Sequence, residues 1–155
     1  MEPLLTTIVL WLSVNFGLIA SYEHPRVEFV PPAKMAQVRY SRLAALRPDR
    51  FASEVGRSAP PEVGQDVNGI YDDHSRTVYL LERWSSVRPS DVSVLVHEMV
   101  HHLQNLSNEK FMCPQEREKD AYKAQRAWLA LFDRTLEQEF ELDPMTVLVR
   151  INCLQ

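Results

Sequence analysis

The sequence His97-Glu98-Met99-Val100-His101 lies in a run whose apolar residues recur at helical spacing. With about 3.6 residues per helical turn, residues four apart lie on the same face, so both imidazoles can reach one cation. Two histidines at this spacing with a glutamate beside the first suit zinc. Zinc lowers the pKa of a bound water to about 7, and Glu98 can take the proton of that water as general base. The motif therefore predicts a helix that carries a zinc site for peptide hydrolysis.

The context of the motif favours this helix. Pro89-Ser90-Asp91 predicts its start, with the serine as N-cap, and Ser107-Asn108 predicts its end. The apolar stripe between them consists of Val92, Leu95, Val96, Met99, Val100, Leu103 and Leu106. His97, His101 and Gln104 form the adjoining polar stripe, and buried imidazoles need partners that a metal supplies. The alternative is a surface helix with incidental histidines.

A zinc site of this kind needs a third protein ligand. The next predicted helix, which begins near Pro114, offers three acidic residues, and helical phase separates them. Its buried stripe is expected to contain Ala121, Ala124, Trp128, Leu131 and Phe132. Glu118 extends this stripe by one turn, whereas Glu116 and Asp120 lie towards the opposite side. A buried carboxylate is costly unless it is paired or metal-bound, so we predict Glu118 as the ligand. The alternative is a first-turn acid that favours the helix dipole.

Two further residues lie near the predicted chemistry. Tyr122 shares the face of Glu118 one turn on, and it can donate a hydrogen bond to a developing oxyanion or be a packed core tyrosine. His102 is rotated by about 100° from His101, so it should not share the metal. We expect His102 to flank the helix or to form a hydrogen bond near the cleft.

The two motifs carry a family resemblance. The first motif with Glu118-Lys119-Asp120-Ala121-Tyr122 resembles small gluzincin-like metallopeptidases, in which a glutamate on the next helix completes the site. The segments 97–104 and 113–122 are similar to small uncharacterised bacterial zincin-like domains with H-E-x-x-H-H-L-Q and C-P-x-E-R-E-x-x-A-Y. The resemblance implies a zincin-like fold and zinc. It also implies that a peptide substrate pairs with the strand before the active helix, here Thr77 to Glu82.

Length and composition indicate one globular domain over residues 1–155. The chain is 45% apolar and 25% charged, which is ordinary for a domain with a single core. The net charge of −4 argues against a nucleic-acid partner, and we expect a peptide or protein substrate instead.

Residues 4–20 carry no charge. A signal peptide is disfavoured because Glu2 replaces a basic start and Leu18-Ile19-Ala20-Ser21 is a poor cleavage site. A membrane anchor would need about 20 apolar residues, and this run is diluted by polar ones. We favour a first helix packed into the domain, with Leu5, Ile8 and Leu12 on its apolar side. Signal peptide and anchor remain open, and only this segment offers membrane association.

The segment up to the motif contains predicted strands and a helix. Arg26 to Val30 alternates like a strand, and Pro31-Pro32 opens a helix to about Leu46. Arg47 to Gly69 predicts a long connection, either a cover for the cleft or a plain mobile loop. Residues 69–71 and 77–81 then form a hairpin, and we expect Asp72, Asp73 and His74 to serve its turn rather than a metal.

The chain after Glu118 is expected to continue its helix to about Phe140. Asp143-Pro144 predicts a further helix start, yet the β-branched residues of 146–151 leave the type of this closing element open. Cys113 and Cys153 can form one disulfide or stay reduced, and neither is expected to bind zinc. A cytoplasmic location is slightly favoured, whereas a signal peptide with paired cysteines would mean the periplasm or secretion.

The sequence thus predicts an α+β zincin-like domain, with a small sheet and hairpin packed on the active helix and a long helix following. His97, His101 and Glu118 would bind one Zn²⁺ per chain, Glu98 would be the general base and Tyr122 a second catalytic candidate. The expected function is that of a zinc metallopeptidase. The alternatives are a non-catalytic binding or regulatory domain with a structural zinc, and a domain in which these residues form a polar network without metal.

Overall fold

The computed structural model describes residues 1–46 and 68–153. Within them lie six helices: α1 (Glu2–Phe16), α2 (Pro32–Leu46), α4 (Pro89–Leu106), α5 (Pro114–Ala130), α6 (Leu136–Phe140) and α7 (Pro144–Ile151). Three strands form one sheet: β1 (Arg26–Val30), β2 (Gly69–Asp72) and β3 (Thr77–Leu81). The fold is mixed α+β, as expected. The expected long connection falls on residues 47–67, outside the described part of the chain.

β3 is the central strand of the sheet. The strand order is β1-β3-β2, with β1 parallel and β2 antiparallel to β3. Both edges of β3 are therefore occupied, and the prediction that Thr77 to Glu82 pairs with a substrate is wrong, because its backbone groups already bond to neighbouring strands. The outer edge of β2 pairs with no strand among the described residues.

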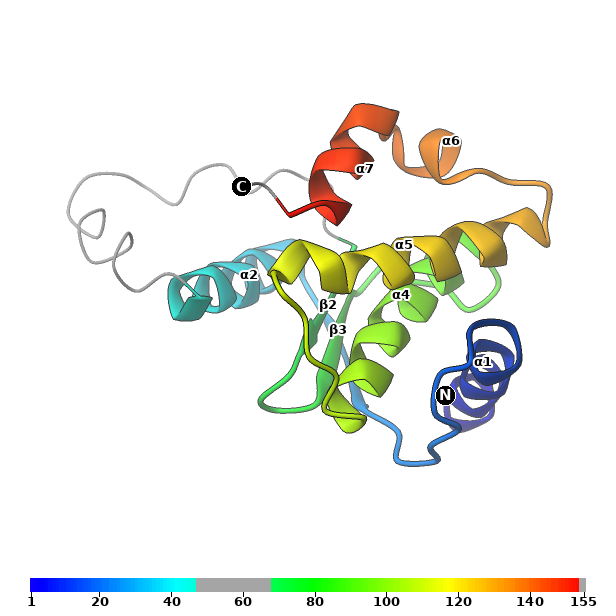
Figure 1. The fold of residues 1–155 in the computed structure, drawn as a ribbon, viewed down its shortest axis with the longest axis horizontal. Coiled ribbons are helices and arrows are strands. Elements are labelled where there is room, and N and C mark those ends of the chain that lie inside the picture. The colour runs from blue at the N-terminus through cyan, green and yellow to red at the C-terminus, as the bar shows by residue number, and fades with distance from the viewer. Residues whose placement is uncertain (47–67, 154–155) are drawn as a thin grey trace.

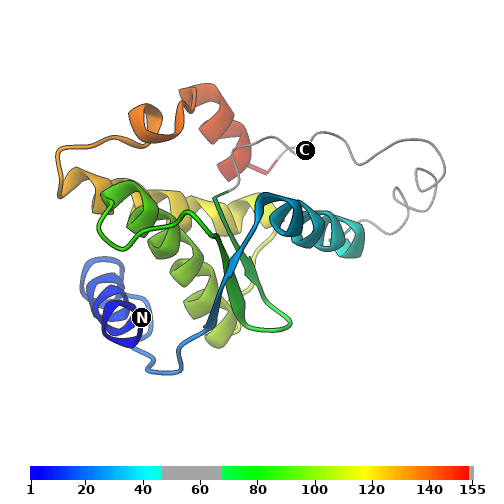
Figure 2. The same ribbon diagram turned by 180° about the vertical axis from the view of Figure 1, so that it is seen from behind.

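The sheet lies between two helices, with α4 against one face and α2 against the other (Figures 1 and 2). Successive side chains of a strand point to opposite faces, and both faces here are buried. Val78 and Leu80 of β3 belong to the core with α4. Leu81 of β3 and Ile70 of β2 instead pack with Met35 of α2. This double coverage explains why β3 is apolar at nearly every position.

Helix α1 packs beside α4, at the side of the domain away from α2 (Figure 1). Leu5, Ile8, Val9 and Leu12 are each at most 1% exposed. The helix ends at Gly17, which adopts φ 68, a conformation that glycine takes without strain. The structure thus agrees with a first helix packed into the domain. No described helix is both long and apolar enough to span a bilayer.

Helix α4 begins two residues earlier than expected. Arg88 is the N-cap and Pro89 occupies the first turn, so the prediction of Ser90 as N-cap is wrong: the fixed φ of proline suits it to the first helical position. Asp91 accepts a hydrogen bond from the backbone N–H of Ser85 at 2.7 Å, which fastens the chain before the helix. The helix ends at Leu106 with Ser107 as C-cap, as the Ser107-Asn108 signal predicts. Its apolar stripe is buried up to Leu103, and Leu106 is partly buried.

Helix α5 is shorter than expected, and the prediction of one helix to Phe140 is wrong. It ends at Ala130, Asp133 turns the chain with φ 54, and Thr135 caps the separate α6. Leu131 and Phe132 are consequently 61% and 46% exposed instead of buried. Local turn and capping geometry overrides the apolar periodicity here.

The closing element is helix α7, capped by Asp143 as the sequence predicts. The Asp143 carboxylate accepts hydrogen bonds from the backbone N–H groups of Met145 and Thr146, and this cap fixes a helix despite the β-branched residues. Cys113 and Cys153 form a disulfide with Cα atoms 5.9 Å apart. The bond joins the chain just after α7 to the N-cap of α5.

Candidate metal centre

Helices α4 and α5 cross in contact and bring three candidate ligands together. Nε2 of His97 lies 3.1 Å from Oε2 of Glu118, and Nε2 of His101 lies 3.4 Å from Oε1 of the same carboxylate. One potential ligand atom from each residue falls within 4.8 Å of the others. The helix that carries the histidines and the next helix therefore converge as the phase argument for Glu118 required.

The donor set fits a tetrahedral zinc ion. With zinc bonds of about 2.1 Å to imidazole nitrogen and carboxylate oxygen, neighbouring ligand atoms of a tetrahedral site lie roughly 3.4 Å apart. The two nitrogen-to-oxygen distances at Glu118 are close to that value. Two imidazoles and one carboxylate also leave the fourth position of such an ion open, which is the arrangement of catalytic rather than structural sites.

Both histidines have a glutamine at the second ring nitrogen. Nδ1 of His97 lies 3.1 Å from Oε1 of Gln125, and Nδ1 of His101 lies 3.1 Å from Oε1 of Gln104. An amide oxygen only accepts, so each Nδ1 carries a hydrogen. In the neutral imidazole each Nε2 then has a lone pair for a metal ion, and in the protonated imidazole Nε2 donates to Glu118 instead. The sequence predicted such second partners without naming them. Gln104 shares the predicted polar stripe of the histidines, whereas Gln125 comes from α5.

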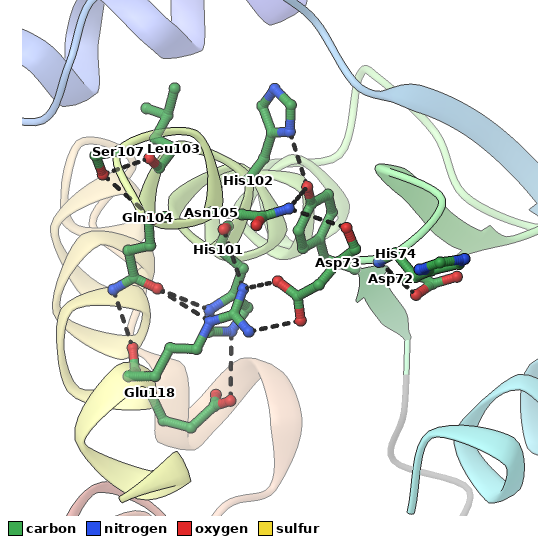
Figure 3. Close-up of polar contacts among 12 residues, drawn as sticks. Asp72, Asp73, His74, His101, His102, Leu103, Gln104, Asn105, Ser107 and Glu118 are labelled. Carbon is green, nitrogen blue, oxygen red and sulfur yellow. Dashed lines mark hydrogen bonds and ion pairs between the residues drawn. The ribbon is translucent and has the colours of Figure 1, made fainter. Parts of the chain in front are cut away.

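Arg117 connects the centre to the hairpin turn. Its guanidinium donates two hydrogen bonds to the carboxylate of Asp73, at 2.7 and 2.5 Å, and a third to the backbone carbonyl of His101 at 3.1 Å. Gln104 in turn donates to the backbone carbonyl of Arg117 at 3.2 Å. Figure 3 shows the carboxylate of Asp73 reaching from the hairpin turn towards His101. Sequence reasoning missed this link, because Asp73 and Arg117 are 44 residues apart.

The neighbouring acidic residue of the turn has the role that was expected. The Asp72 carboxylate accepts hydrogen bonds from the backbone N–H of His74 at 3.1 Å and from the hydroxyl of Ser75 at 2.7 Å. Asp72 and His74 lie away from the candidate ligands His101 and Glu118 (Figure 3). The turn reading is thus confirmed for these two residues, whereas Asp73 serves the centre indirectly.

Glu98 lies beside the ligands and against the first residue of β2. Its side chain is 6% exposed. A Cβ atom at Gly69 would lie only 3.3 Å from Oε1 of Glu98, so the carboxylate approaches bare backbone there. Among the described residues, none donates a hydrogen bond to this carboxylate. A nearly buried carboxylate without a protein donor is suited to holding water.

Tyr122 lies between the centre and the C-terminal helix. Its ring meets the ring of His97 edge to face, with centroids 4.8 Å apart, and its hydroxyl accepts a hydrogen bond from Arg150 at 3.0 Å. Burial raises the pKa of Tyr122 against the opposing effect of Arg150, so the phenol keeps its proton. Tyr122 packs in the cluster with Leu129 and Val147, so the alternative of a packed core tyrosine is confirmed, whereas its role as a donor to an oxyanion stays a prediction.

His102 belongs to a different network on the other side of α4, away from His101 and Glu118 (Figure 3). It is 1% exposed, with Nε2 2.6 Å from the carbonyl oxygen of Glu23 and Nδ1 3.1 Å from the hydroxyl of Tyr71. Burial lowers its pKa, so it is neutral at pH 7. His102 takes no part in the metal group, as expected, and it ties the segment before β1 to α4.

Without an ion, His97, His101 and Glu118 form a charged cluster. Burial disfavours protonation of His97, yet its hydrogen bond to Glu118 and the charges of Glu98 and Glu118 outweigh this and raise its pKa. Burial likewise disfavours ionisation of Glu118, but the charge and hydrogen bond of His101, together with His97, hold the Glu118 pKa far below its usual value. A divalent cation would replace the proton that this cluster attracts.

Comparison with known proteins identifies the family but no activity. A family model described as a domain of unknown function (DUF6647) matches residues 1–155, so the chain belongs to that family. Neither the curated proteins nor the solved structures contain a match to the chain.

Proposed function

We propose that this domain is a zinc-dependent metallopeptidase in which His97, His101 and Glu118 hold one zinc ion and Glu98 is the general base. The observation that carries the proposal is the convergence of the three ligand atoms within 4.8 Å, next to a carboxylate that no described residue binds. The small sheet, the active helix and the crossing α5 are the arrangement expected of a zincin-like fold, which we include in the proposal.

The chemistry follows from the position of each group. Zinc at this site would polarise the substrate carbonyl and lower the pKa of a coordinated water to about 7. Glu98 accepts the proton of the attacking water and returns it to the amine that leaves. Gln104 and Gln125 fix the ring orientations of the two histidines, and Arg117 fixes α4 against the hairpin turn. Tyr122 offers its hydroxyl to the oxygen on which negative charge develops.

The carboxylate of Glu98 favours catalysis over a structural role for the ion. A structural zinc site is closed by four protein ligands, whereas only three are gathered among the described residues. Burying an ionised carboxylate costs free energy unless a partner compensates for it. In a catalytic site the attacking water is the partner of the Glu98 carboxylate. A structural site provides no such partner.

The outer edge of β2 is the place where an extended peptide substrate would pair. Gly69 begins this strand and touches Glu98, so backbone bound along the edge would pass next to the general base. Strand addition uses main-chain hydrogen bonds and places few demands on the side chains of the peptide. This assignment replaces β3, whose edges are both occupied.

The first experiment measures zinc per chain and hydrolysis of a quenched fluorogenic peptide library, for the parent protein and for Glu98→Gln. The protein is purified without chelators or a metal-binding tag. We expect about one zinc per chain in both proteins and loss of hydrolysis in Glu98→Gln alone. Turnover retained by Glu98→Gln would refute the assigned base.

Other outcomes separate the alternatives. A parent protein that binds zinc, cleaves no peptide and loses thermal stability on His97→Ala would support the non-catalytic zinc domain instead. Folded protein that takes up no zinc at neutral pH would refute both metal-based functions and leave the polar network as the explanation of the motif.

A further inference from the structure

The C-terminal helix α7 reaches the candidate centre through one side chain. Nη1 of Arg150 donates a hydrogen bond to the Tyr122 hydroxyl at 3.0 Å, across 28 residues of sequence. Tyr122 in turn packs its ring against that of His97. A cationic group contributed by the last helix is thus separated from a metal ligand by a single tyrosine.

The hydrogen bond from Arg150 determines which way the Tyr122 hydroxyl can donate. A phenol oxygen carries one hydrogen and accepts through its lone pairs. Guanidinium only donates, so Arg150 occupies a lone pair and the hydroxyl hydrogen must point elsewhere. The negative charges of Glu118 and Glu98 both act on this hydroxyl, so the metal side is the direction that attracts the hydrogen. The hydroxyl hydrogen is therefore available for donation on the side away from Arg150, and the ring contact with His97 places Tyr122 beside the centre.

The position of Arg150 depends on how firmly α7 is held. Val147 is the one residue of this helix that is buried, at 1% exposure, and Ile151 packs in part against the same cluster. The apolar side chains on the other faces of α7 are about half exposed or more: Met145, Leu148 and Val149. Eight residues with so little buried surface form a weak attachment.

The disulfide strengthens the attachment of α7 at its C-terminal end, close to Arg150. Cys153 follows Arg150 by three residues, and its partner Cys113 is the N-cap of α5, the helix that carries Glu118 and Tyr122. The bond therefore fixes the end of α7 to the start of the helix that its arginine must reach. We call Arg150 together with the Cys113–Cys153 bond the C-terminal brace.

We propose that Arg150 is a positioning residue that aims the Tyr122 hydroxyl at the developing oxyanion, and that the Cys113–Cys153 disulfide holds Arg150 in place. The proposal rests on the metallopeptidase function proposed above. It assigns the C-terminal helix a role in the transition state rather than in binding zinc or folding the domain.

A double-mutant cycle tests the role of Arg150. Removing an oxyanion donor typically lowers kcat by about 100-fold or more, so we expect a loss of this size for Tyr122→Phe and at least roughly tenfold for Arg150→Met, with KM little changed. The double variant should be no worse than Tyr122→Phe alone, because Arg150 acts through that hydroxyl. Arg150→Lys, which keeps a donor, should recover part of the loss.

The matched control is Arg134→Met, which removes an exposed arginine paired with Glu139 at 2.7 Å and should turn over like the parent. Zinc content is measured for every variant and should stay at the level of the parent, since none of these residues is a ligand. Independent additive losses from Arg150→Met and Tyr122→Phe would overturn the positioning role.

The disulfide is tested by Cys113→Ser with Cys153→Ser in the full chain, with amide hydrogen exchange as a readout that does not depend on turnover. We expect faster exchange across residues 144–151, retained zinc and a kcat lowered towards that of Arg150→Met. Unchanged exchange and kcat would overturn the holding role of the disulfide. An active parent with a fully active Arg150→Met overturns this inference alone, whereas a parent that binds zinc and cleaves no peptide overturns both proposals.

Discussion

Gly69 at the start of β2 lies so close to Glu98 in the middle of α4 that no side chain fits between them. A Cβ atom at Gly69 would lie 3.2 Å from Cγ of Glu98 and 2.6 Å from Cγ1 of Val94. The second distance is shorter than real Cβ contacts, so a larger residue must displace either the strand or the helix. The candidate base and the candidate substrate edge are therefore fitted to each other.

Replacing Gly69 by alanine should lower kcat strongly while leaving zinc content unchanged. The added methyl group pushes Glu98 and β2 apart, but it does not touch the three ligands. Zinc analysis and peptide turnover measure the two effects separately. Gly17→Ala is the control: it meets open space, and its left-handed φ of 68 should cost about 1 kcal/mol of stability without an effect on kcat per folded chain. Full activity of Gly69→Ala would show that the contact does not position the base.

Glu118 and Glu116 provide a matched pair on the same helix. Glu118→Gln replaces a charged ligand with a weaker neutral one and should reduce zinc well below one per chain. Glu116→Gln should retain zinc, because the Glu116 carboxylate accepts a hydrogen bond from the backbone N–H of Met112 and lies outside the cluster. Zinc content after dialysis distinguishes them. Equal zinc in both variants would remove Glu118 from the ligand set.

Asp73 should contribute to zinc affinity although it is not a ligand. Its carboxylate holds Arg117, which bonds to the carbonyl of His101, and loss of such indirect support typically costs about 10- to 100-fold in metal affinity. Asp73→Asn should therefore weaken zinc in competition with a chromogenic chelator. Asp72→Asn, one residue earlier, disturbs only the hairpin turn and should leave the affinity unchanged. A larger loss of zinc affinity in Asp72→Asn than in Asp73→Asn would contradict the support of His101 by Arg117.

The metal-free protein should be more stable at mildly acidic pH than at alkaline pH. The raised pKa of His97 adds stability that is complete below its unfolded value of 6.5 and is lost as the pH rises through the folded value. The lowered pKa of Glu118 adds stability above 4.5 that is lost only as the pH falls through its folded value. Both contributions are present between these two unfolded values, so the free energy of unfolding with chelator should be higher near about pH 5.5 than near about pH 8.

Urea unfolding of Glu118→Gln provides the control for this pH dependence. The variant should lose most of the acidic stabilisation of the chelated protein. His102 contributes in the opposite direction in both proteins, because burial lowers its pKa. Zinc affinity of the parent should rise with pH, since the ion requires neutral imidazoles. A parent and a variant with the same pH profile would refute the His97–Glu118 coupling.

The disulfide should contribute substantially to stability. In the chain-entropy model, closing a loop of the 40-residue separation between Cys113 and Cys153 is worth roughly 4 kcal/mol. The double serine variant should therefore unfold at lower urea concentration in the metal-loaded state. The parent treated with a phosphine reductant, which has no thiol to compete for zinc, should match it, and an unchanged midpoint in both would show that packing of Val147 and Ile151 alone holds α7.

The sequence alone was sufficient for the features that depend on local geometry. Helical spacing requires His97 and His101 to face the same way. Helical phase also separates Glu118 from Glu116 on the next helix: Glu118 lies in the candidate cluster, and Glu116 lies outside it. The bounds of β1, α2 and the hairpin also followed from alternation, proline and turn residues. These signals act over a few residues, so they are readable without knowledge of the fold.

The tertiary structure decided what depends on distant partners. The pairing order that makes β3 central, the choice of Gln125 and Arg117 as supports, and the contact of Arg150 with Tyr122 each join segments far apart in sequence. Such contacts depend on how helices cross and strands order, because many arrangements satisfy the same local pattern. The chain thus encodes its candidate ligands locally, whereas the groups that orient them, the β2 edge that no described strand covers and the C-terminal brace exist only in the folded domain.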